Sequence, residues 1–327
     1  MKRLLLLLLC IVLPLCAACN NAPADTDINA GNSSVSSAVS SDETPATAES
    51  DIADDVLPPS AAQQPVTDYW YEHMTDVQKG YYNTIYTQVE SMNTEPFLIT
   101  HNDEELSGNV NIALCGLLSD HPEIFWVSGS YEVLMDTHGD YYLTLKYEME
   151  SSERDQKRTL IENKVSEILN NTESLSYFEK EVYFHDYLCD TVVYTSENGQ
   201  MCYTAYGALL DGKAVCEGYS RAMQLLCKRA GINCTLVRGT ADGVAHMWNI
   251  VELSGEWYQL DVTWDDVSNK ANFYNYFNLT SAQMYTTHTA YQNLKNDNLK
   301  EVELTTGYNY YLPLCSGTYY SRDRIGK

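Results

Sequence analysis

Residues 212–266 read GKAVCEGYSRAMQLLCKRAGINCTLVRGTADGVAHMWNIVELSGEWYQLDVTWDD, and three reactive side chains stand in them in order: Cys216, His246 and Asp261. Apolar residues after the cysteine recur with the spacing of one helical face, up to a glycine at 231 that is typical of a helix end. We therefore expect Cys216 in the first turn of a helix. Backbone N–H groups there lack intrahelical partners, and the positive end of the helix dipole favours a thiolate.

The histidine and the aspartate belong to a predicted hairpin. Residues 246–253 and 256–263 are rich in β-formers, and Ser254-Gly255 between them is a turn signal. A two-residue loop places His246 opposite Thr263, with Asp261 as its diagonal neighbour on the same face of the sheet. The hairpin can therefore present an imidazole and a carboxylate side by side.

A thiol at a helix start and a histidine oriented by a carboxylate form the arrangement of nucleophile, base and orienting group found in acyl-transfer enzymes. The histidine accepts the thiol proton, and the carboxylate holds the imidazole in one tautomer. Local patterns do not bring the helix start to the hairpin. We infer that the helix start contacts the hairpin, and this inference joins Cys216 to His246 and Asp261.

The motifs GKAVCEGYS, HMWN and WYQLDVTWDD, in this order, resemble those of the transglutaminase-like superfamily, whose core is a papain-like Cys-His-Asp fold. The resemblance extends over about 120 residues, from Tyr183 to Tyr311. It implies acyl transfer through a cysteine thioester at Cys216, either peptide hydrolysis or amide exchange. Met247 departs from the alanine that many relatives carry after the histidine.

The expected fold is α+β: a papain/transglutaminase-like core with the nucleophile at a helix N-terminus packed on an antiparallel sheet, preceded by a smaller α/β region. The predicted division is a lipoprotein signal peptide at 1–18 and a lipid-anchored disordered tether at 19–65. An N-terminal α/β region at 66–152 and the catalytic domain at 153–327 follow. The 327 residues suffice for such a core with a smaller region before it.

The N-terminus predicts export. Lys2 and Arg3 precede a short apolar run at 4–15, and the run ends in Leu15-Cys16-Ala17-Ala18-Cys19. This ending resembles the bacterial lipobox, although Cys16 stands where a leucine is usual, and it makes Cys19 the predicted lipidation site. Residues 20–65 are dominated by small and polar residues that cannot build a core. We expect a protein held at the cell surface by lipid and facing outward.

The charge of the chain limits its partners. The sequence has 45 acidic against 20 basic residues, a formal net charge of −25. A nucleic-acid partner would need basic surface, so none is expected, and contact with the membrane is expected through the lipid anchor only. No cofactor and no metal ion are expected, because thiolate, imidazole and backbone donors suffice for the chemistry.

Other candidate groups receive structural interpretations. His121 and Glu123 belong to a predicted turn, and the pair His185-Asp186 is interpreted as helix surface or packing. The pair Asp265-Asp266 is interpreted as a loop of solvated acids. Ten cysteines are present, of which two lie in the signal peptide and two are Cys19 and Cys216. The six others allow 15 disulfide connectivities, and the sequence leaves these open.

The function predicted from these observations is a surface-anchored cysteine acyl-transfer enzyme that acts on peptide or cell-wall amide bonds. Its substrate would be a peptide, a protein or peptidoglycan. The alternative is a non-catalytic binding or assembly module that keeps the fold as a scaffold.

Overall fold

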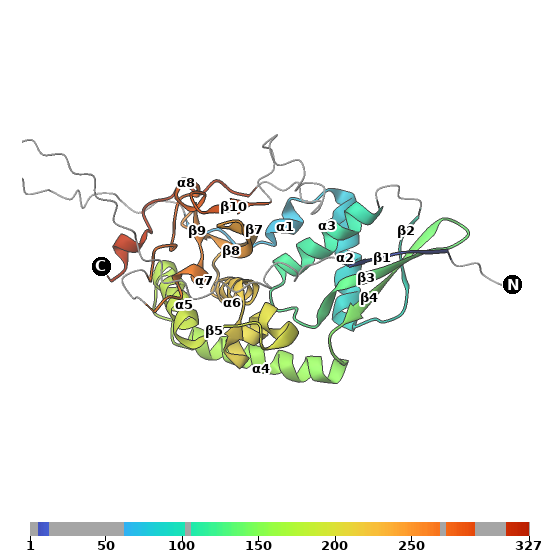
Figure 1. The fold of residues 1–327 in the computed structure, drawn as a ribbon, viewed down its shortest axis with the longest axis horizontal. Helices are drawn as coiled ribbons and strands as arrows, with labels where there is room; N and C mark the ends of the chain where they lie inside the picture. The colour runs from blue at the N-terminus through green and yellow to red at the C-terminus, as the bar shows by residue number, and fades with distance from the viewer. Residues whose placement is uncertain (1–5, 13–61, 102–105, 269–272, 292–311, 327) are drawn as a thin grey trace, which may run out of the picture.

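The structure is a computed structural model that describes residues 6–12, 62–101, 106–268, 273–291 and 312–326. Cys19 and most of the predicted tether lie outside these residues. The chain divides into two halves in space, with the helix α4 (Ser151–Asn170) running along one side of both (Figure 1).

The N-terminal half combines helices with an antiparallel sheet of order β1-β3-β4-β2. Its helix α2 begins where the side chain of Thr75 accepts the N–H of Gln78, while Gln78 bonds back to the backbone of Thr75. The helices of this half are α1 (Tyr69–Glu72), α2 (Asp76–Ser91) and α3 (Leu106–Asp120), and its strands are β1 (Leu6–Val12), β2 (Phe97–His101), β3 (Val127–Met135) and β4 (Asp140–Tyr147).

Strand β1 lies within the predicted signal peptide. It pairs antiparallel with β3, from Leu6 opposite Met135 to Val12 opposite Ser130. If residues 1–18 are removed as the sequence predicts, β3 becomes an edge strand of a three-stranded sheet. In the part of the chain that the structure describes, no helix combines the length and the apolar composition needed to span a membrane.

The C-terminal half contains a second antiparallel sheet, of order β10-β7-β8-β9, with helix α6 packed against it. The strands are β7 (Cys234–Ala241), β8 (Val244–Leu253), β9 (Glu256–Leu260) and β10 (His288–Ala290). The other elements of this half are α5 (Tyr177–Thr191), α6 (Cys216–Arg229), α7 (Val262–Asp265), α8 (Ser281–Met284) and the short parallel pair β5 (Val193–Tyr194) and β6 (Lys213–Ala214). The mixed α/β architecture, with α6 packed on an antiparallel sheet, agrees with the fold class expected from the sequence.

The predicted hairpin forms with the predicted register. Leu253 pairs with Glu256 across the turn, and Asn249 pairs with Leu260. Both turn residues have positive φ, 53° at Ser254 and 82° at Gly255, as a two-residue hairpin loop requires.

The predicted second strand of the hairpin is too long. It ends at Leu260, and residues 262–265 form the short helix α7. The cause is Asp261, whose Oδ1 accepts the backbone N–H groups of Thr263 and Trp264 at 3.0 and 3.2 Å. The cap gives these two N–H groups a hydrogen-bond acceptor at the start of a helix. The chain therefore begins a helix after the aspartate instead of continuing the strand.

The two halves share one hydrophobic core, and buried polar contacts join them. From α6, the Gln224 side chain donates to the Ser119 carbonyl oxygen at 2.7 Å, and Arg221 donates to the Leu118 carbonyl oxygen. Arg221 is itself paired with Glu217, one turn earlier, at 2.8 Å. Because these contacts reach α3 from the helix that carries Cys216, the N-terminal half helps to place that helix.

Candidate active site

Cys216 is the first residue of α6, as the sequence predicts. The first intrahelical bond runs from the Tyr219 N–H to the Val215 carbonyl oxygen at 3.1 Å, so the N–H groups of residues 216–218 precede the hydrogen-bond ladder. Glycine at 218 is required here, because a Cβ atom would collide with the carbonyl oxygen of Cys202. The short 3₁₀ helix Gly199–Tyr203, which contains Cys202, thus lies directly against the helix start.

The start of α6 lies against β8, one residue from His246. Cys216 belongs to a small buried cluster that also contains Met247, the neighbour of His246. The Ser220 hydroxyl, one turn into the helix, lies 2.8 Å from the Cys216 carbonyl oxygen and 3.0 Å from that of Met247. From the same strand, Asn249 donates to the Ser220 carbonyl oxygen at 3.0 Å. The tertiary structure thus brings the predicted nucleophile to the strand of the predicted base.

His246 and Asp261 are hydrogen-bonded. The Nε2 atom of His246 lies 2.6 Å from Oδ2 of Asp261, and their side chains are 7% and 0% exposed. A carboxylate only accepts, so Nε2 carries a proton, and the proton of Cys216 would be accepted by Nδ1. This is the tautomer that a base oriented by a carboxylate needs.

The Asp261 carboxylate is held ionised. Burial alone would raise its pKa, but the charge of His246 and the hydrogen bonds from His246 and His288 outweigh burial and lower the pKa below its usual value. The carboxylate therefore stabilises a positive charge that develops on the adjacent imidazole.

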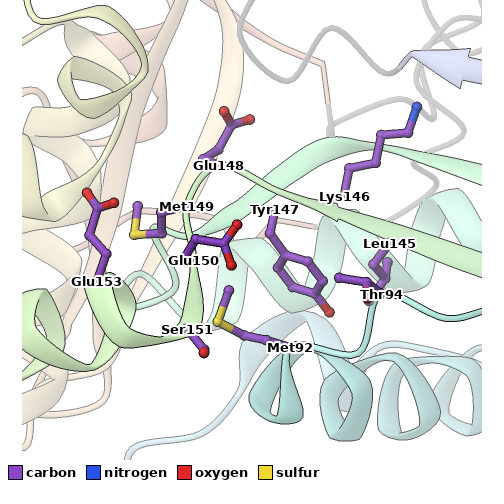
Figure 2. Close-up of a pocket in the computed structure, with 10 residues that line it drawn as sticks. All are labelled: Met92, Thr94, Leu145, Lys146, Tyr147, Glu148, Met149, Glu150, Ser151 and Glu153. Atoms are coloured by element: carbon purple, nitrogen blue, oxygen red, sulfur yellow. The ribbon is translucent and has the colours of Figure 1, made fainter.

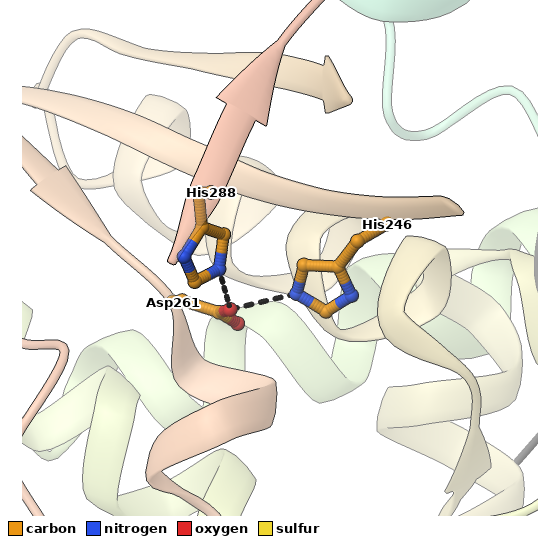
Figure 3. Close-up of side chains that lie close together, drawn as sticks. All are labelled: His246, Asp261 and His288. Carbon is orange, nitrogen blue, oxygen red and sulfur yellow. Dashed lines mark hydrogen bonds and ion pairs between the residues drawn. The ribbon is translucent and has the colours of Figure 1, made fainter. Parts of the chain in front are cut away.

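His288 is a member of this group that the sequence does not predict. Its Nε2 atom lies 3.0 Å from the same oxygen of Asp261 that His246 contacts (Figure 3). His288 opens β10, and the hairpin spacing that links His246 to Asp261 carries no information about that strand. The only signal in the sequence that could have pointed to His288 is that aromatic residues stand near it in the chain.

Among the described residues, one group has ligand atoms close enough together for a metal ion, all within 4.8 Å of one another: His246, Asp261 and His288. Two imidazoles and a carboxylate suit zinc. Zinc bonds of about 2.0–2.2 Å set ligand atoms roughly 3.3 Å apart, however. The 2.6 Å between His246 and Asp261 is a hydrogen-bond distance instead. The group therefore fits two N–H donors on one oxygen better than a metal ion.

Of the two interpretations of the His185-Asp186 pair, helix surface or packing, packing is confirmed for His185, which is buried. Its Nδ1 and Nε2 atoms lie 2.9 Å from Asp186 and 3.2 Å from Asp265, and its side chain is 0% exposed. Burial opposes its charge, but the hydrogen bonds to these carboxylates hold the pKa of His185 well above its usual value. Asp265 is buried as well and accepts the Tyr276 N–H at 2.8 Å, so the expectation of a solvated acidic loop is wrong.

The other side chains considered in the sequence lie elsewhere. His121 pairs with Glu123 at 2.9 Å and stacks on Tyr86, in keeping with a structural turn. Five described cysteines are buried thiols without a disulfide bond: Cys115, Cys189, Cys227, Cys234 and Cys315.

A hollow of about 760 Å³ lies in the N-terminal half, where β4 leads into α4 (Figure 2). Carboxylates of Glu148, Glu150 and Glu153 line it together with Met92 and Tyr147. None of its lining residues belongs to the group around Asp261, so this hollow is separate from the candidate active site.

Comparisons with known proteins agree with the motifs. Residues 163–262 match the family model described as the transglutaminase-like superfamily. The chain is 27% identical over 113 residues to the kyphoscoliosis peptidase of Homo sapiens and 28% identical over 113 residues to that of Mus musculus. Each match covers 28% of this chain and 17% of the relative, so the chain spans a small part of either relative's length.

A solved structure described as a TGase aligns with 54% of this chain and 53% of its own, at 16% identity and a TM-score of 0.30. The matched segment at 163–262 contains Cys216, His246 and Asp261. The segment at 163–262 is thus similar to the core domain of the transglutaminase-like superfamily.

Proposed function

We propose that the protein is a surface-anchored cysteine acyl-transfer enzyme that acts on peptide or cell-wall amide bonds through Cys216, His246 and Asp261. The observation that carries the proposal is the 2.6 Å bond from His246 to Asp261 on a strand against which the Cys216 helix start is packed. A thiol, an imidazole and an ionised carboxylate in this order supply nucleophile, base and orienting group.

In the first half-reaction, Nδ1 of His246 accepts the thiol proton of Cys216, and the thiolate sulfur attacks the amide carbonyl carbon. The tetrahedral oxyanion is stabilised by N–H groups at the start of α6. As the C–N bond breaks, His246 returns its proton to the leaving nitrogen. An amine departs, and the acyl group remains on Cys216 as a thioester.

In the second half-reaction, His246 removes a proton from water or from an acceptor amine, which attacks the thioester carbonyl carbon. The C–S bond breaks and the Cys216 sulfur is protonated again. Water gives a carboxylic acid, and an amine gives a new amide. The curated relatives are named peptidases, which favours peptide amides as acyl donors and hydrolysis as the outcome.

The substrate must reach a sulfur that is nearly enclosed, because Cys216 is only 1% exposed. The half-buried aromatic side chains packed on its cluster are Tyr194 and Tyr203. A small reagent should therefore modify Cys216 faster than a bulky one of the same chemistry. Such low exposure favours an extended peptide strand over a folded surface as the substrate.

The test is the rate of Cys216 alkylation by iodoacetamide, followed from pH 4 to pH 9 by peptide mass spectrometry. The proposal expects an inflection at roughly pH 3.5–7.5, below the value of about 8.5 for an unperturbed thiol. His246→Ala should move this inflection upward. On an identified amide substrate, Asp261→Asn should reduce turnover by up to about 10⁴-fold, as in serine triads, because it favours the wrong tautomer.

Cys115 is the matched internal control, because burial raises the pKa of its thiol to about 11. It should react slowly and independently of His246. An unperturbed titration of Cys216 that His246→Ala leaves unchanged would contradict the proposal and favour the scaffold. Mass spectrometry of amines and cross-linked products from peptide and peptidoglycan mixtures would then separate hydrolysis from amide exchange.

A further inference from the structure

Four donors converge on the carboxylate of Asp261, which is 1% exposed. Its Oδ1 accepts the two N–H groups that begin α7, and its Oδ2 accepts from the imidazoles of His246 and His288. A carboxylate offers about four acceptor sites, so its hydrogen-bonding capacity is used up. Figure 3 shows both imidazoles directed at the same oxygen from different strands.

His288 is held firmly on its own side. It opens β10, which pairs with β7 so that His288 stands opposite Ala241. Its Nδ1 lies 2.8 Å from the hydroxyl of Thr287, and its side chain is 0% exposed. Since both ring nitrogens have partners, the ring cannot turn without losing one of them.

Aromatic rings enclose the remaining sides of His288. The ring centroids of Trp248 and Trp264 lie 4.9 and 4.8 Å from its own, and that of Tyr276 lies at 5.6 Å. The titratable groups that face His288 are therefore Asp261, His246 and Tyr276. Nothing in the two half-reactions uses His288, yet it is bonded to the oxygen on which the orientation of His246 depends.

We propose that His288 is a positioning residue: its Nε2–H fixes Oδ2 of Asp261 so that the same oxygen holds His246 with Nδ1 toward Cys216. This inference rests on the proposed function of the three side chains. Without His288, the N–H groups of α7 still hold Oδ1 of Asp261, but His246 alone would hold Oδ2. The His246 imidazole and Oδ2 could then move together. The proton-accepting nitrogen would then spend less time in line with the sulfur.

The test compares His288→Phe with His288→Gln in the full-length protein. Phenylalanine keeps a ring but removes the donor, whereas the terminal amide of glutamine reaches about the position of Nε2 and can still donate to Asp261. The readout is the pH profile of Cys216 alkylation by iodoacetamide, which requires no known substrate. His121→Gln is the control for loss of a histidine outside this group.

We expect His288→Phe to slow alkylation at pH 6 by about tenfold or more, the size of effect expected from a hydrogen bond to a charged group. The pH of half-maximal rate should rise by about one unit. His288→Gln should stay within about threefold of the wild-type rate, and His121→Gln should match the wild type. Near-ultraviolet circular dichroism checks folding.

If His288→Phe does not fold, His288→Asn replaces it, because the shorter amide cannot reach Oδ2 and should be as slow as the donor-free ring. A folded His288→Phe with the wild-type profile overturns the inference, as does a His288→Gln that is as slow as His288→Phe. A wild-type Cys216 that titrates like an ordinary thiol removes the proposed function together with this inference. If adding EDTA changes the pH profile of Cys216 alkylation in the wild type, His246, Asp261 and His288 bind a metal ion, and the inference is overturned.

Discussion

His185 of α5 and Asp265 of α7 bind each other in the interior, with Nε2 and Oδ2 3.2 Å apart and both side chains fully buried. Asp265 ends the single turn that Asp261 begins. The bond therefore ties α7, which Asp261 caps, to α5. A buried histidine outside the candidate active site thus helps to set the position of Asp261.

Loss of this contact should cost stability. His185→Gln should lower the free energy of unfolding by roughly 3–5 kcal/mol, because it leaves a buried carboxylate without its charged partner. The double variant with Asp265→Asn should lose less than the sum of the two single losses. Urea unfolding at pH 6 measures the free energy of unfolding of the two single variants and the double variant. Strictly additive losses would show that the two side chains do not act as a pair.

The sign of the pH dependence follows from the raised pKa of His185. The stability that protonated His185 contributes is complete below about pH 6.5, its unfolded value, and is lost as pH rises through the folded pKa. A control is His101→Gln, since His101 pairs with Asp140 at the surface with 65% of its side chain exposed. That change should cost less than about 1 kcal/mol.

Glu181 should make the protein less stable as pH rises. Burial raises its pKa to about 8, although Asn278 donates to it and His185 lies near. Between about pH 4.3 and pH 8 the folded state holds a proton that the unfolded state releases, so stability falls with increasing pH. Glu181→Gln should flatten this slope and raise the free energy of unfolding at pH 8 by more than about 1 kcal/mol.

Urea unfolding at pH 5 and pH 8 measures this difference. The exposed Glu173 provides the control, because Glu173→Gln should leave the slope unchanged. A wild-type protein that is equally stable at both pH values, together with a Glu181→Gln variant that is no more stable, would contradict the assignment.

The lipid anchor predicted at Cys19 lies outside the described residues and stays a prediction. Cys19→Ala should abolish incorporation of labelled fatty acid in the native host and either release the protein to the medium or leave it unprocessed. Cys10→Ala is the matched control, because Cys10 lies in the apolar run before the lipobox-like ending, and it should leave labelling intact. Mature wild-type protein without lipid on Cys19 would refute the anchor.

The end of the predicted tether can be placed more sharply than the sequence allowed. Gln63 bonds to the backbone of Glu252 and Ser254 at 3.2 Å each, and Asn233 holds the Pro65 carbonyl oxygen at 3.0 Å. Deleting residues 20–61 should leave the melting temperature within about 2 °C of wild type. Deleting 20–67 should lower it by more than about 3 °C, since several hydrogen bonds of about 0.5–1.5 kcal/mol each are lost.

Thermal unfolding of the two truncated proteins checks this boundary. Equal melting temperatures in both would show that residues 62–67 add nothing to the fold. If deleting 20–61 already lowers the melting temperature strongly, the segment at 20–61 packs on the domain.

Much of the site follows from local rules. The helix at Cys216 follows from the 3.6-residue spacing of its apolar face, and the hairpin follows from its turn residues. The parity of the strand pair predicts that His246 and Asp261 meet, and they do, but β9 ends at Leu260, so Asp261 reaches His246 from the cap of α7 and not from a paired strand position. Each of these relations spans few residues, which is why a pattern in the chain suffices to predict it.

Other features depend on contacts between distant segments. The approach of Cys216 to β8, the arrival of His288 at Asp261 and the burial of His185 each require the sheet and its helices to close around one core. The helix at 262–265 escaped prediction for a related reason, because the Asp261 side chain serves as helix cap and as partner of His246 at once. Periodicity reports which face of an element is buried, whereas the partner across the core is chosen by packing and by the pairing of buried polar groups.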